Sequence, residues 1–567
     1  MPKIVFKIEG GEDGSIFAVE AKAAPGESLF ELAREAGVPI DAPCAGNGTC
    51  GKCRVRLVEG DLSQRQAQGL QAGGHSRFLS DAEFADGWRL ACESAVSGDA
   101  VVSVPAAAAS YIGSIALEVA DGESMAEIEE DRGTVSGLAV DVGTTGVSVL
   151  LVDMDTGFVL AKASAGNGQI RYGADVINRI IEQQKPGGIL RLQKAIINDT
   201  LIPLIDSLCN ATGVSCESII RMVVASNTTM NHLLLGVDAN SIRIEPYEPA
   251  FLEFEPYNPA GIGFHFAQDA QLILAPNIGS YVGGDITAGV LAARTRQGVS
   301  EPLPSHIWNR AEMSLLIDLG TNGEIVFGNE DFLMACACSA GPAFEGGDIS
   351  CGMRAAAGAI ESCSIAGLSM EPVFSVIGGG KPVGLCGSGL IDVVAELFRA
   401  GIINGKGKFS RDGERIRRDE YGSGCFVLVF AADSGSGRDI VITETDIDNY
   451  IRAKAAIFSG IMSLLSPLGF SVADIDDVLI AGGIGSGINI KNAISIGMLP
   501  KLSEDRFCYI GNSSLDGAYE ILVSPDAGKR VHEIAANMTY IDLSTEAGYM
   551  DEFVAACFLP HTDGALF

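Results

Sequence analysis

The stretch LAVDVGTTGVSVLLVD, residues 138–153, decides how most of this chain folds. Two apolar runs flank the tight turn DVGTTG, which predicts a buried β-hairpin with Gly and Thr at its tip. Residues 315–327, LLIDLGTNGEIVF, repeat this arrangement 177 positions later, counted from Asp141 to Asp318. That separation is too long for a solenoid repeat and indicates a duplicated domain.

The two turns carry groups that bind a triphosphate. Backbone N–H groups and Thr hydroxyls at a hairpin tip can bind phosphate oxygens, and an Asp at the strand end can hold the water shell of Mg2+. One such hairpin can be purely structural, but two copies in matching contexts favour nucleotide binding. The candidate residues for ATP and Mg2+ are Asp141, Gly143, Thr144, Thr145, Asp318, Gly320, Thr321 and Asn322.

A third candidate element is DIDDVLIAGGIGSGINIKNAISIGMLP, residues 474–500. A buried strand is predicted to end there in a glycine-rich turn, with a helix after it. The glycines are not spaced as in a dinucleotide-binding fingerprint. They would instead let the backbone lie flat against a purine and its ribose. The residues expected to contact adenosine are Gly482, Gly483 and Gly485.

Two segments are predicted to be connecting helices. GSYVGGDITAGVLAAR, residues 279–294, precedes the second hairpin, and SSLDGAYEILVS, residues 513–524, follows the glycine-rich turn. Both carry small residues at close spacing, which suits a tight helix crossing between two lobes.

Upstream of the hairpins, four cysteines form a pattern typical of an iron–sulfur site. DAPCAGNGTCGKC, residues 41–53, has five residues between its first two cysteines and two between its last two, and RLACESAV supplies a fourth. Thiolates are the ligands that such clusters require, and the loop's glycines permit the sharp turns. Zinc also binds four cysteines but usually takes two close pairs. The predicted [2Fe–2S] ligands are Cys44, Cys50, Cys53 and Cys92.

The flanks of the cysteine loop predict a β-grasp domain. KIVFKIEG (3–10) and SIFAVEAK (15–22) alternate like paired strands. SLFELAREAGV (28–38) has the pattern of a short amphipathic helix, and CRVRLVEG (53–60) that of a further strand. The five-residue gap between the first two cysteines resembles the adrenodoxin and putidaredoxin branch of [2Fe–2S] ferredoxins.

The order of the downstream elements resembles the actin, Hsp70 and sugar-kinase superfamily, whose ATP lies in a hinged cleft between two RNase-H-like lobes. The resemblance implies an α/β multidomain chain that starts with an α+β ferredoxin domain. The expected boundaries are 1–106 for that domain, 107–134 for a linker, 135–308 for the first lobe and 309–567 for the second. The same resemblance points to Asp285, near the first connecting helix, as the carboxylate that positions water for ATP hydrolysis.

A ferredoxin domain joined to such an ATPase resembles the reductive activators of corrinoid proteins, which occur with corrinoid-dependent methyl transfer in anaerobes. Further segments carry this likeness: NRI after YGADV (172–180), ASNTTMNHLLLG (225–236), APNIGSYVGGDITAG (275–289), ACSAGPAFEGGDISCGMRAAAGAIE (337–361) and CGSGLID (386–392). It implies an ATP-dependent reductase that passes one electron through the cluster and reduces inactive Co(II) to Co(I).

The partners implied are a corrinoid protein and a low-potential electron donor. The corrinoid protein could be a methyltransferase corrinoid subunit or a corrinoid iron–sulfur protein, and a homodimer is left open. Ser339, just after the second hairpin, offers a weak oxygen ligand that could approach cobalt; the alternative is an ordinary turn serine. Five other cysteines fit no second-cluster spacing, and we expect buried free thiols: Cys336, Cys338, Cys351, Cys363 and Cys386.

The composition and net charge limit the kinds of partner and the location expected for this protein. A formal net charge of −33 makes nucleic acid an unfavourable partner. The N-terminus lacks an apolar signal region, and no uncharged apolar run nears the roughly 20 residues that span a bilayer, so we expect a cytoplasmic protein that binds no membrane. The alternatives are a small-molecule kinase fused to a ferredoxin, an ATP-switched electron-transfer adaptor, and a radical-dehydratase activator, which would lack the ferredoxin domain.

Overall fold

The computed structural model describes residues 1–9, 16–40, 42, 46, 48, 51–65, 76, 78–105, 115–120, 135–295, 312–419, 422–483 and 487–567. The chain divides into two compact units. The first comprises Met1–Met222, Thr229–Ala250 and Tyr257–Leu272. The second comprises Val223–Thr228, Phe251–Pro256 and Ile273–Phe567.

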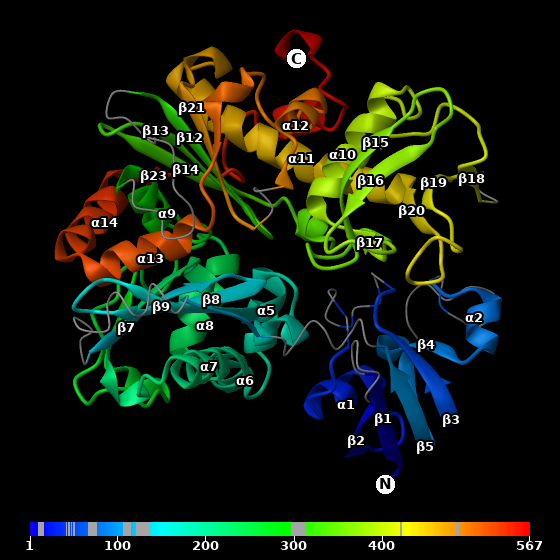
Figure 1. Ribbon diagram of the computed structural model, residues 1–567, viewed down its shortest axis with the longest axis horizontal. Coiled ribbons are helices and arrows are strands. Elements are labelled where there is room, and N and C mark those ends of the chain that lie inside the picture. The colour runs from blue at the N-terminus through cyan, green and yellow to red at the C-terminus, as the bar shows by residue number, and fades with distance from the viewer. Residues whose placement is uncertain are drawn as a thin grey trace. The chain divides into compact units, whose positions relative to one another are not determined.

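The first unit begins with a five-stranded sheet in the order β2-β1-β5-β3-β4 (Figure 1). β1 pairs antiparallel with β2 and parallel with β5, which is the β-grasp arrangement expected from the sequence. Helix α1 is capped by the Ser28 side chain, which accepts from the Glu31 N–H, and buries Leu29 and Phe30 against this sheet. The elements are β1 Lys3–Glu9, β2 Ile16–Lys22, α1 Leu29–Glu35, β3 Arg54–Gln64, α2 Asp81–Ala85, β4 Trp88–Leu90 and β5 Ser94–Val104.

The next sheet contains the first repeat of the duplicated hairpin and has six strands in the order β11-β10-β7-β8-β9-β6. β7, β8 and β9 form an antiparallel meander. β6 pairs antiparallel with β9, so the predicted linker contains one strand of this sheet. The strands are β6 Ala116–Val119, β7 Ser136–Val142, β8 Gly146–Asp153, β9 Val159–Gly166, β10 Ile219–Ser226 and β11 Gln271–Leu274. The accompanying helices are α5 Val176–Gln183, α6 Gly188–Ile196, α7 Ile202–Thr212 and α8 Thr228–Leu235.

The second unit contains the second repeat, in a sheet ordered β22-β21-β12-β13-β14-β23. Its meander β12-β13-β14 is antiparallel, and β21 joins it in parallel beside β12. Because β21 occupies the place that β10 has in the other sheet, the duplication extends beyond the hairpins. The strands are β12 Ser314–Leu319, β13 Gly323–Gly328, β14 Leu333–Cys338, β21 Asp477–Ala481, β22 Phe507–Tyr509 and β23 Met538–Tyr540.

Between β14 and β21 the chain inserts two three-stranded sheets, β16-β15-β17 and β18-β19-β20. Their strands are β15 Ala359–Ile365, β16 Pro372–Val376, β17 Gly384–Leu385, β18 Ile416–Arg418, β19 Gly424–Val429 and β20 Ile440–Thr443. The helices of the second unit are α9 Gly284–Thr295, α10 Gly387–Arg399, α11 Glu444–Leu465, α12 Ile490–Ser495, α13 Ser513–Val523, α14 Pro525–Asn537 and α15 Tyr549–Ala556.

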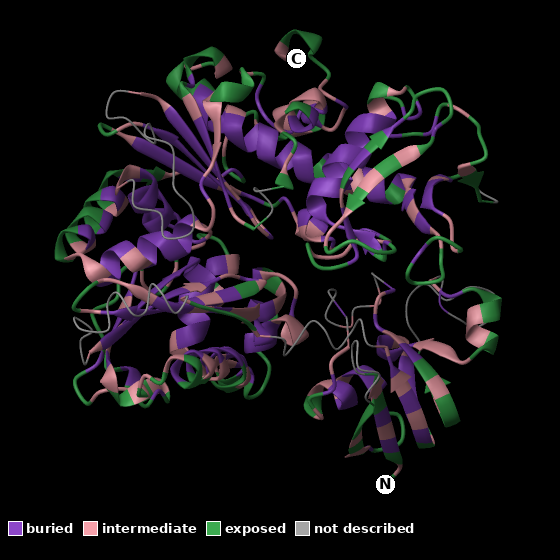
Figure 2. Cartoon of the chain, viewed as in Figure 1, coloured by how far each residue is buried: buried purple, intermediate pink, exposed green. Residues whose placement is uncertain are grey.

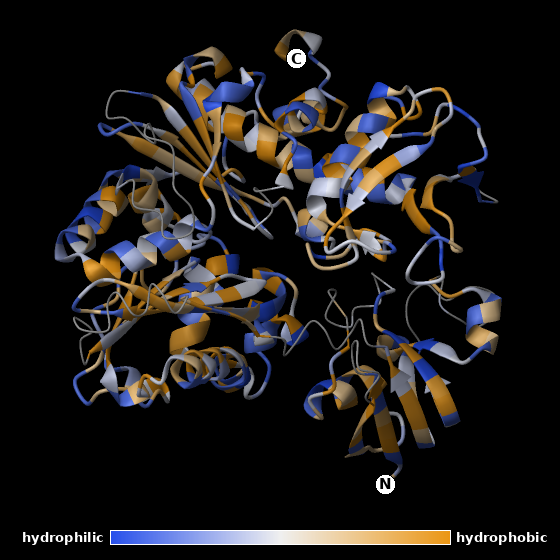
Figure 3. Cartoon of the chain, in the orientation of Figure 1, coloured by the Kyte–Doolittle hydropathy of each residue, from blue (hydrophilic) through white to orange (hydrophobic). Residues whose placement is uncertain are grey.

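The core of the second unit is formed by the meander strands and by α10 and α11, which are largely buried (Figure 2). The meander strands are mostly hydrophobic along their length (Figure 3), as strands covered on both faces must be. α11 is capped by Thr443 and Asp446 in a capping box. By length and composition Glu444–Leu468 could cross a membrane, but 72% of its apolar 18-residue stretch is buried, as in a core helix.

Candidate functional site

The first hairpin turn, Gly143 to Thr145, joins β7 and β8 in the first unit. Asp141 is half-buried at the end of β7, where its pair partner is Ser148. A side chain at Gly143 would bring its Cβ within 2.8 Å of the Gly146 carbonyl oxygen, so the tight turn requires glycine there. The tip of this hairpin is therefore narrow, and its polar groups are mainly backbone N–H and C=O groups.

The carbonyl oxygens of this turn are held by two side chains that sequence reasoning missed. Asn167 donates from Nδ2 to the Gly143 oxygen at 2.9 Å and from its backbone N–H to the Thr145 oxygen at 2.9 Å. The Arg179 guanidinium donates to the Thr144 oxygen. With all three carbonyls engaged, the peptide groups of the turn are fixed in orientation, which is what an anion site made from backbone dipoles needs.

Arg179 is fully buried, with 0% of its surface exposed. Its guanidinium also donates to the Gly173 carbonyl at 2.9 Å and to Gln169 Oε1 at 3.2 Å. A buried cation satisfied in this way is both a structural anchor and a positive charge behind the turn. Arg179 belongs to the NRI triplet that the family resemblance marked, but no local pattern assigned it a partner.

The second hairpin turn, Gly320 to Asn322, joins β12 and β13 in the second unit. Asp318 pairs with Glu324 across the hairpin and with Ala481 of β21. A Cβ at Gly482 would lie 2.7 Å from Asp318 Oδ1, so the glycine-rich turn after β21 and this carboxylate are brought together. The Thr321 hydroxyl donates to Glu345 Oε1 at 3.1 Å.

Glu324 is a further residue of this site that sequence reasoning missed. Burial raises the pKa of its carboxyl well above the usual value, and the charges of Asp285 and Asp318 raise it further. Burial and the two acidic neighbours therefore favour the protonated form of Glu324. A protonated carboxyl can donate a hydrogen bond as well as accept one.

The predicted catalytic Asp285 is half-buried in the first turn of α9. Its own Oδ1 accepts from the Ile286 N–H at 2.9 Å. α9 packs against α13 (Figure 1), and a Cβ at Gly289 would lie only 2.8 Å from Ser513 Oγ. The predicted close packing of these two helices is thus present. Asp285, in the first turn of α9, lies close enough to Glu324 of β13 for its charge to raise the pKa of that carboxyl.

The glycine-rich turn opens with Gly482, whose φ of +93° favours glycine. Its N–H donates to the Gly511 oxygen at 3.1 Å, and its carbonyl accepts from the Tyr509 hydroxyl at 3.0 Å. A Cβ at Gly483 would meet no atom within 4 Å, so the backbone there is open to a ligand. The predicted Gly485 lies outside the described residues.

Magnesium fits the acidic groups of the second hairpin only through water. Among the residues that the structure describes, no three His, Cys, Asp or Glu side chains are arranged to hold a metal ion directly. Mg2+ usually keeps several waters and takes one or two carboxylates together with substrate phosphates. Asp318 and Asp285 are suited to hold such waters.

Two of the four predicted cluster ligands are described, and they lie together. Cys53 and Cys92 are both buried, and their Sγ atoms lie 3.2 Å apart. Gly46 has a φ of +86°, and a Cβ there would come within 2.8 Å of the Phe30 ring. The site thus combines paired thiols with a glycine-lined loop, which fits a cluster held by thiolates. Cys44 and Cys50 lie outside the described residues.

The five cysteines expected to be buried thiols are spread over the second unit, except that Cys336 and Cys338 are neighbours on β14. The Cys338 thiol contacts the Gly323 oxygen at 3.0 Å, and that of Cys386 the Ile360 oxygen at 3.2 Å. Burial raises the pKa of the Cys363 thiol to about 12. Cys336 is also fully buried, and Cys351 is half-buried. Ser339, the residue expected near cobalt, is exposed directly after β14.

Three family models match the chain in succession. The model for a 2Fe-2S iron-sulfur cluster binding domain matches residues 12–97. The RACo middle region matches residues 136–297, and the C-terminal domain of RACo, the ASKHA domain, matches residues 312–567. They confirm the predicted fold class, a ferredoxin domain followed by an ATPase of the actin, Hsp70 and sugar-kinase type. They also confirm the predicted [2Fe–2S] cluster and ATP as cofactors.

Individual proteins are similar to this chain over most of its length. It is 32% identical to the corrinoid activation enzyme RamQ of Eubacterium limosum over 434 residues, which cover 75% of this chain and 70% of that one. It is 23% identical to the [Co(II) methylated amine-specific corrinoid protein] reductase of Methanosarcina barkeri, over 71% and 73% of the two chains. A solved structure of a reductive activator for corrinoid, iron-sulfur protein is 37% identical and covers 100% of both chains, with a TM-score of 0.68.

Proposed function

The chain belongs to the family of reductive activators of corrinoid proteins, and on that basis we propose how its residues carry out ATP-dependent reduction. The reaction moves one electron from the [2Fe–2S] cluster to a corrinoid protein and returns inactive Co(II) to Co(I), with hydrolysis of ATP. The observation that carries the proposal is the presence, on one chain, of the buried Cys53–Cys92 thiol pair and the duplicated phosphate hairpin.

The cluster would be held by Cys44, Cys50, Cys53 and Cys92. When bound, it accepts and releases one electron at a time. Cys53 and Cys92 sit in the folded core of the ferredoxin domain, where burial limits access of water to their sulfur atoms. Cys53 and Cys92 are therefore positioned to exclude solvent from one side of the cluster.

ATP would be bound by the residues of the two hairpins and of the glycine-rich turn. At the first hairpin, Arg179 and Asn167 hold Gly143, Thr144 and Thr145 with their peptide dipoles fixed. At the second, Asp318 would hold the waters of Mg2+, and Asp285 would orient the water for hydrolysis of the γ-phosphate. Gly482 and Gly483 allow the adenosine to approach the backbone closely.

The protein that supplies cobalt would be a methyltransferase corrinoid subunit or a corrinoid iron–sulfur protein. We place Ser339 next to the cobalt, where a weak hydroxyl ligand could replace a stronger axial one and make reduction easier. Its exposure at the end of β14 suits contact with a partner. We also propose a low-potential electron donor and a cytoplasmic location, and we leave open whether the chain forms a homodimer.

The test is an anaerobic mixture of the full-length protein with a Co(II) corrinoid protein, a chemical reductant and Mg-ATP. The expected result is a Co(I) absorption band that needs ATP and is lost when the cluster is not loaded. No band with any candidate partner, or an equal band without ATP, would refute the proposal. A phosphorylated metabolite formed in place of free phosphate would instead identify a kinase.

Two variants assign the roles of residues in this reaction. Asp285→Asn should bind ATP but lower its hydrolysis by about a hundredfold or more, because a positioned general base typically contributes that much. Ser339→Ala should bind and hydrolyse ATP normally and give less Co(I). An unchanged Co(I) yield in Ser339→Ala would remove that residue from the cobalt site.

A further inference from the structure

The loop that follows β14, residues 339–350, contacts the second hairpin directly and the glycine-rich turn through the start of α10. We call it the coupling loop. It contains one short 3-10 turn, Pro342–Glu345, and then Gly346 with a φ of +77°. Ser339 opens the loop and is exposed, whereas Phe344 in its middle is 1% exposed. The loop therefore has an outer end and a buried centre.

The first contact joins the coupling loop to the second phosphate hairpin. Thr321, at the tip of that hairpin, donates its hydroxyl proton to Glu345 Oε1 at 3.1 Å. Thr321 is 7% exposed, and Glu345 is half-buried. A hydroxyl can donate one hydrogen bond, so Thr321 cannot donate to Glu345 and to a phosphate oxygen at the same time.

The second contact runs through the start of α10 to the glycine-rich turn. A Cβ at Gly387, the first residue of α10, would collide with the Phe344 carbonyl oxygen. The next residue, Ser388, places its Oγ 3.0 Å from where a Cβ at Gly487 would lie. Close approaches therefore connect the coupling loop, through the start of α10, to Gly487 at the end of the turn expected to bind adenosine.

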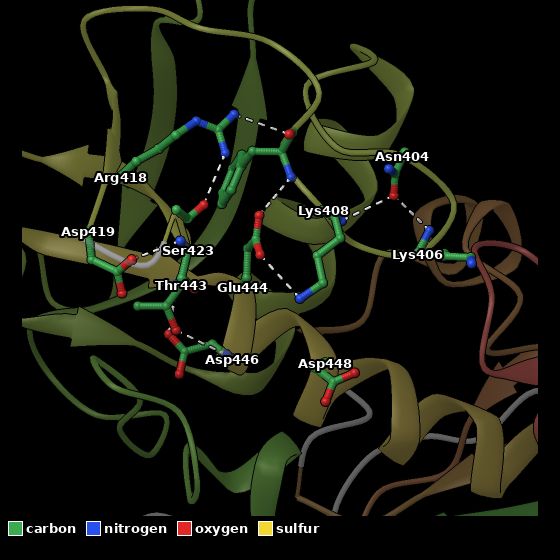
Figure 4. Close-up of polar contacts among 12 residues, drawn as sticks. Asn404, Lys406, Lys408, Arg418, Asp419, Ser423, Thr443, Glu444, Asp446 and Asp448 are labelled. Carbon is green, nitrogen blue, oxygen red and sulfur yellow. Dashed lines mark hydrogen bonds and ion pairs between the residues drawn. The ribbon is translucent and has the colours of Figure 1, made fainter.

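The far end of the coupling loop is fixed. Ser350 donates from its N–H and its hydroxyl to Asp446 Oδ1, at 2.8 and 3.0 Å. Asn449 Nδ2 donates to the Asp348 oxygen at 2.8 Å. Asp446 itself caps α11 together with Thr443 (Figure 4). Since α11 is a 22-residue core helix, residues 348–350 are anchored, and the Phe344 ring also packs against Tyr450 of α11. The Glu345 side chain accepts from the Thr321 hydroxyl.

We propose that the Thr321–Glu345 hydrogen bond is the link by which bound ATP changes the coupling loop. Resting on the proposed function, this inference assigns Glu345 as a positioning residue for the surface that carries Ser339. When a phosphate oxygen accepts the hydrogen bond from the Thr321 hydroxyl, Glu345 loses its hydrogen-bond donor. The Glu345 carboxylate then lies near the negatively charged phosphate. The Glu345 side chain and the exposed outer end of the loop, which carries Ser339, then shift relative to the buried Phe344 and the anchored residues 348–350. ATP shifts this equilibrium because it binds one state of the loop better than the other.

The link is tested on the full-length chain by amide hydrogen exchange, with and without a non-hydrolysable Mg-ATP analogue. In the wild type, the analogue should change exchange in residues 339–347 and leave residues 348–350 unchanged. Glu345→Ala should raise exchange in 339–347 by about tenfold without nucleotide, the effect of losing a hydrogen bond to a charged group. The analogue should then cause no further change.

Two more variants serve as controls. Glu345→Gln keeps an acceptor for Thr321 without the charge, so it should restore slow exchange without nucleotide and weaken the response to the analogue. Glu371→Gln removes a carboxylate of the same unit that pairs with Arg415 at its surface and should behave as the wild type. Two results would overturn the link. One is wild-type exchange that does not change when the analogue is added, and the other is a change in Glu345→Ala as large as that in the wild type.

The remaining outcomes separate the link from the reaction. Glu345→Ala should bind the analogue up to about tenfold more tightly than the wild type, because the nucleotide no longer competes with Glu345 for the Thr321 hydroxyl. Loss of binding would overturn the inference by making Glu345 part of the binding site. Because exchange is measured without a corrinoid protein, an intact response together with no Co(I) formation would refute the proposed reaction alone.

Discussion

The two phosphate hairpins share a backbone arrangement but differ in the charges behind them. The first is supported by a buried cation, since Arg179 donates to Thr144 and Asn167 to its neighbours. The second is supported by acids, with Glu324 buried beside Asp285 and Asp318. A duplicated fold thus supplies two similar turns, and side chains from outside the turns decide what each can do.

This difference suggests a division of labour. A positive charge and fixed peptide dipoles attract phosphate oxygens, whereas carboxylates hold the water shell of Mg2+ and orient a water molecule. The first hairpin would therefore mainly bind, and the second would mainly serve hydrolysis.

The largest effect is expected for Arg179→Ala. Three acceptors lose the hydrogen-bond donor that the buried Arg179 guanidinium supplies: the carbonyl oxygens of Thr144 and Gly173 and the Gln169 Oε1 atom. Loss of one partner from a buried charged network costs about 3–5 kcal/mol of unfolding free energy. ATP affinity should fall as well. Denaturant unfolding and equilibrium binding measure both effects. Arg452→Ala, which removes an exposed pair with Asp448, should cost under about 1 kcal/mol.

Glu324→Gln tests the acidic side of the contrast through pH. The folded-state pKa of Glu324 is raised, so folding stability is fully present below the ordinary pKa of 4.5. It is lost as pH rises toward the raised value, because the unfolded chain then binds fewer protons. Glu324→Gln should lack this slope and keep its ATPase activity. Unfolding midpoints between about pH 5 and pH 8 would decide this, and equal slopes in both proteins would argue against a protonated Glu324.

Asn167→Ala should weaken the first hairpin moderately. It removes the Nδ2 donor to the Gly143 oxygen but keeps the backbone N–H bond to the Thr145 oxygen. One unsatisfied buried carbonyl costs about 1–3 kcal/mol. The ATP dissociation constant should rise while the maximal rate of hydrolysis stays near the wild-type value. A fall in that rate with unchanged affinity would contradict the assignment of the first hairpin to binding.

The smallest effect is expected for Tyr509→Phe at the glycine-rich turn. The variant loses one hydroxyl donor to the Gly482 oxygen and keeps the ring. Because Tyr509 is half-buried, water can replace the donor, and the cost should be about 0.5–1.5 kcal/mol. Competition binding of ATP and of inorganic triphosphate would reveal it, with weaker ATP binding and unchanged triphosphate binding.

Sequence patterns sufficed wherever the chemistry lies in a short stretch of backbone. The DxGT turns, the glycine-rich turn and the cysteine loop each combine glycines with a few ligands over a short distance, so they could be recognised without coordinates. The family, the fold class and the two cofactors followed from these patterns and their order. The β-grasp strands and α1 could also be predicted, because their alternation and capping are local.

What only the tertiary structure decided is which distant side chains support those stretches. Arg179 reaches Thr144 across 35 positions and Glu345 reaches Thr321 across 24, and no spacing rule connects them. Glu324 was inside a recognised hairpin, yet its raised pKa depends on burial and on Asp285 from another element. Backbone turns are specified by neighbouring residues, whereas burial and charge depend on everything that packs around a group. The sequence therefore determined the fold class and the two cofactors, and the fold determined which charged side chains lie behind each hairpin.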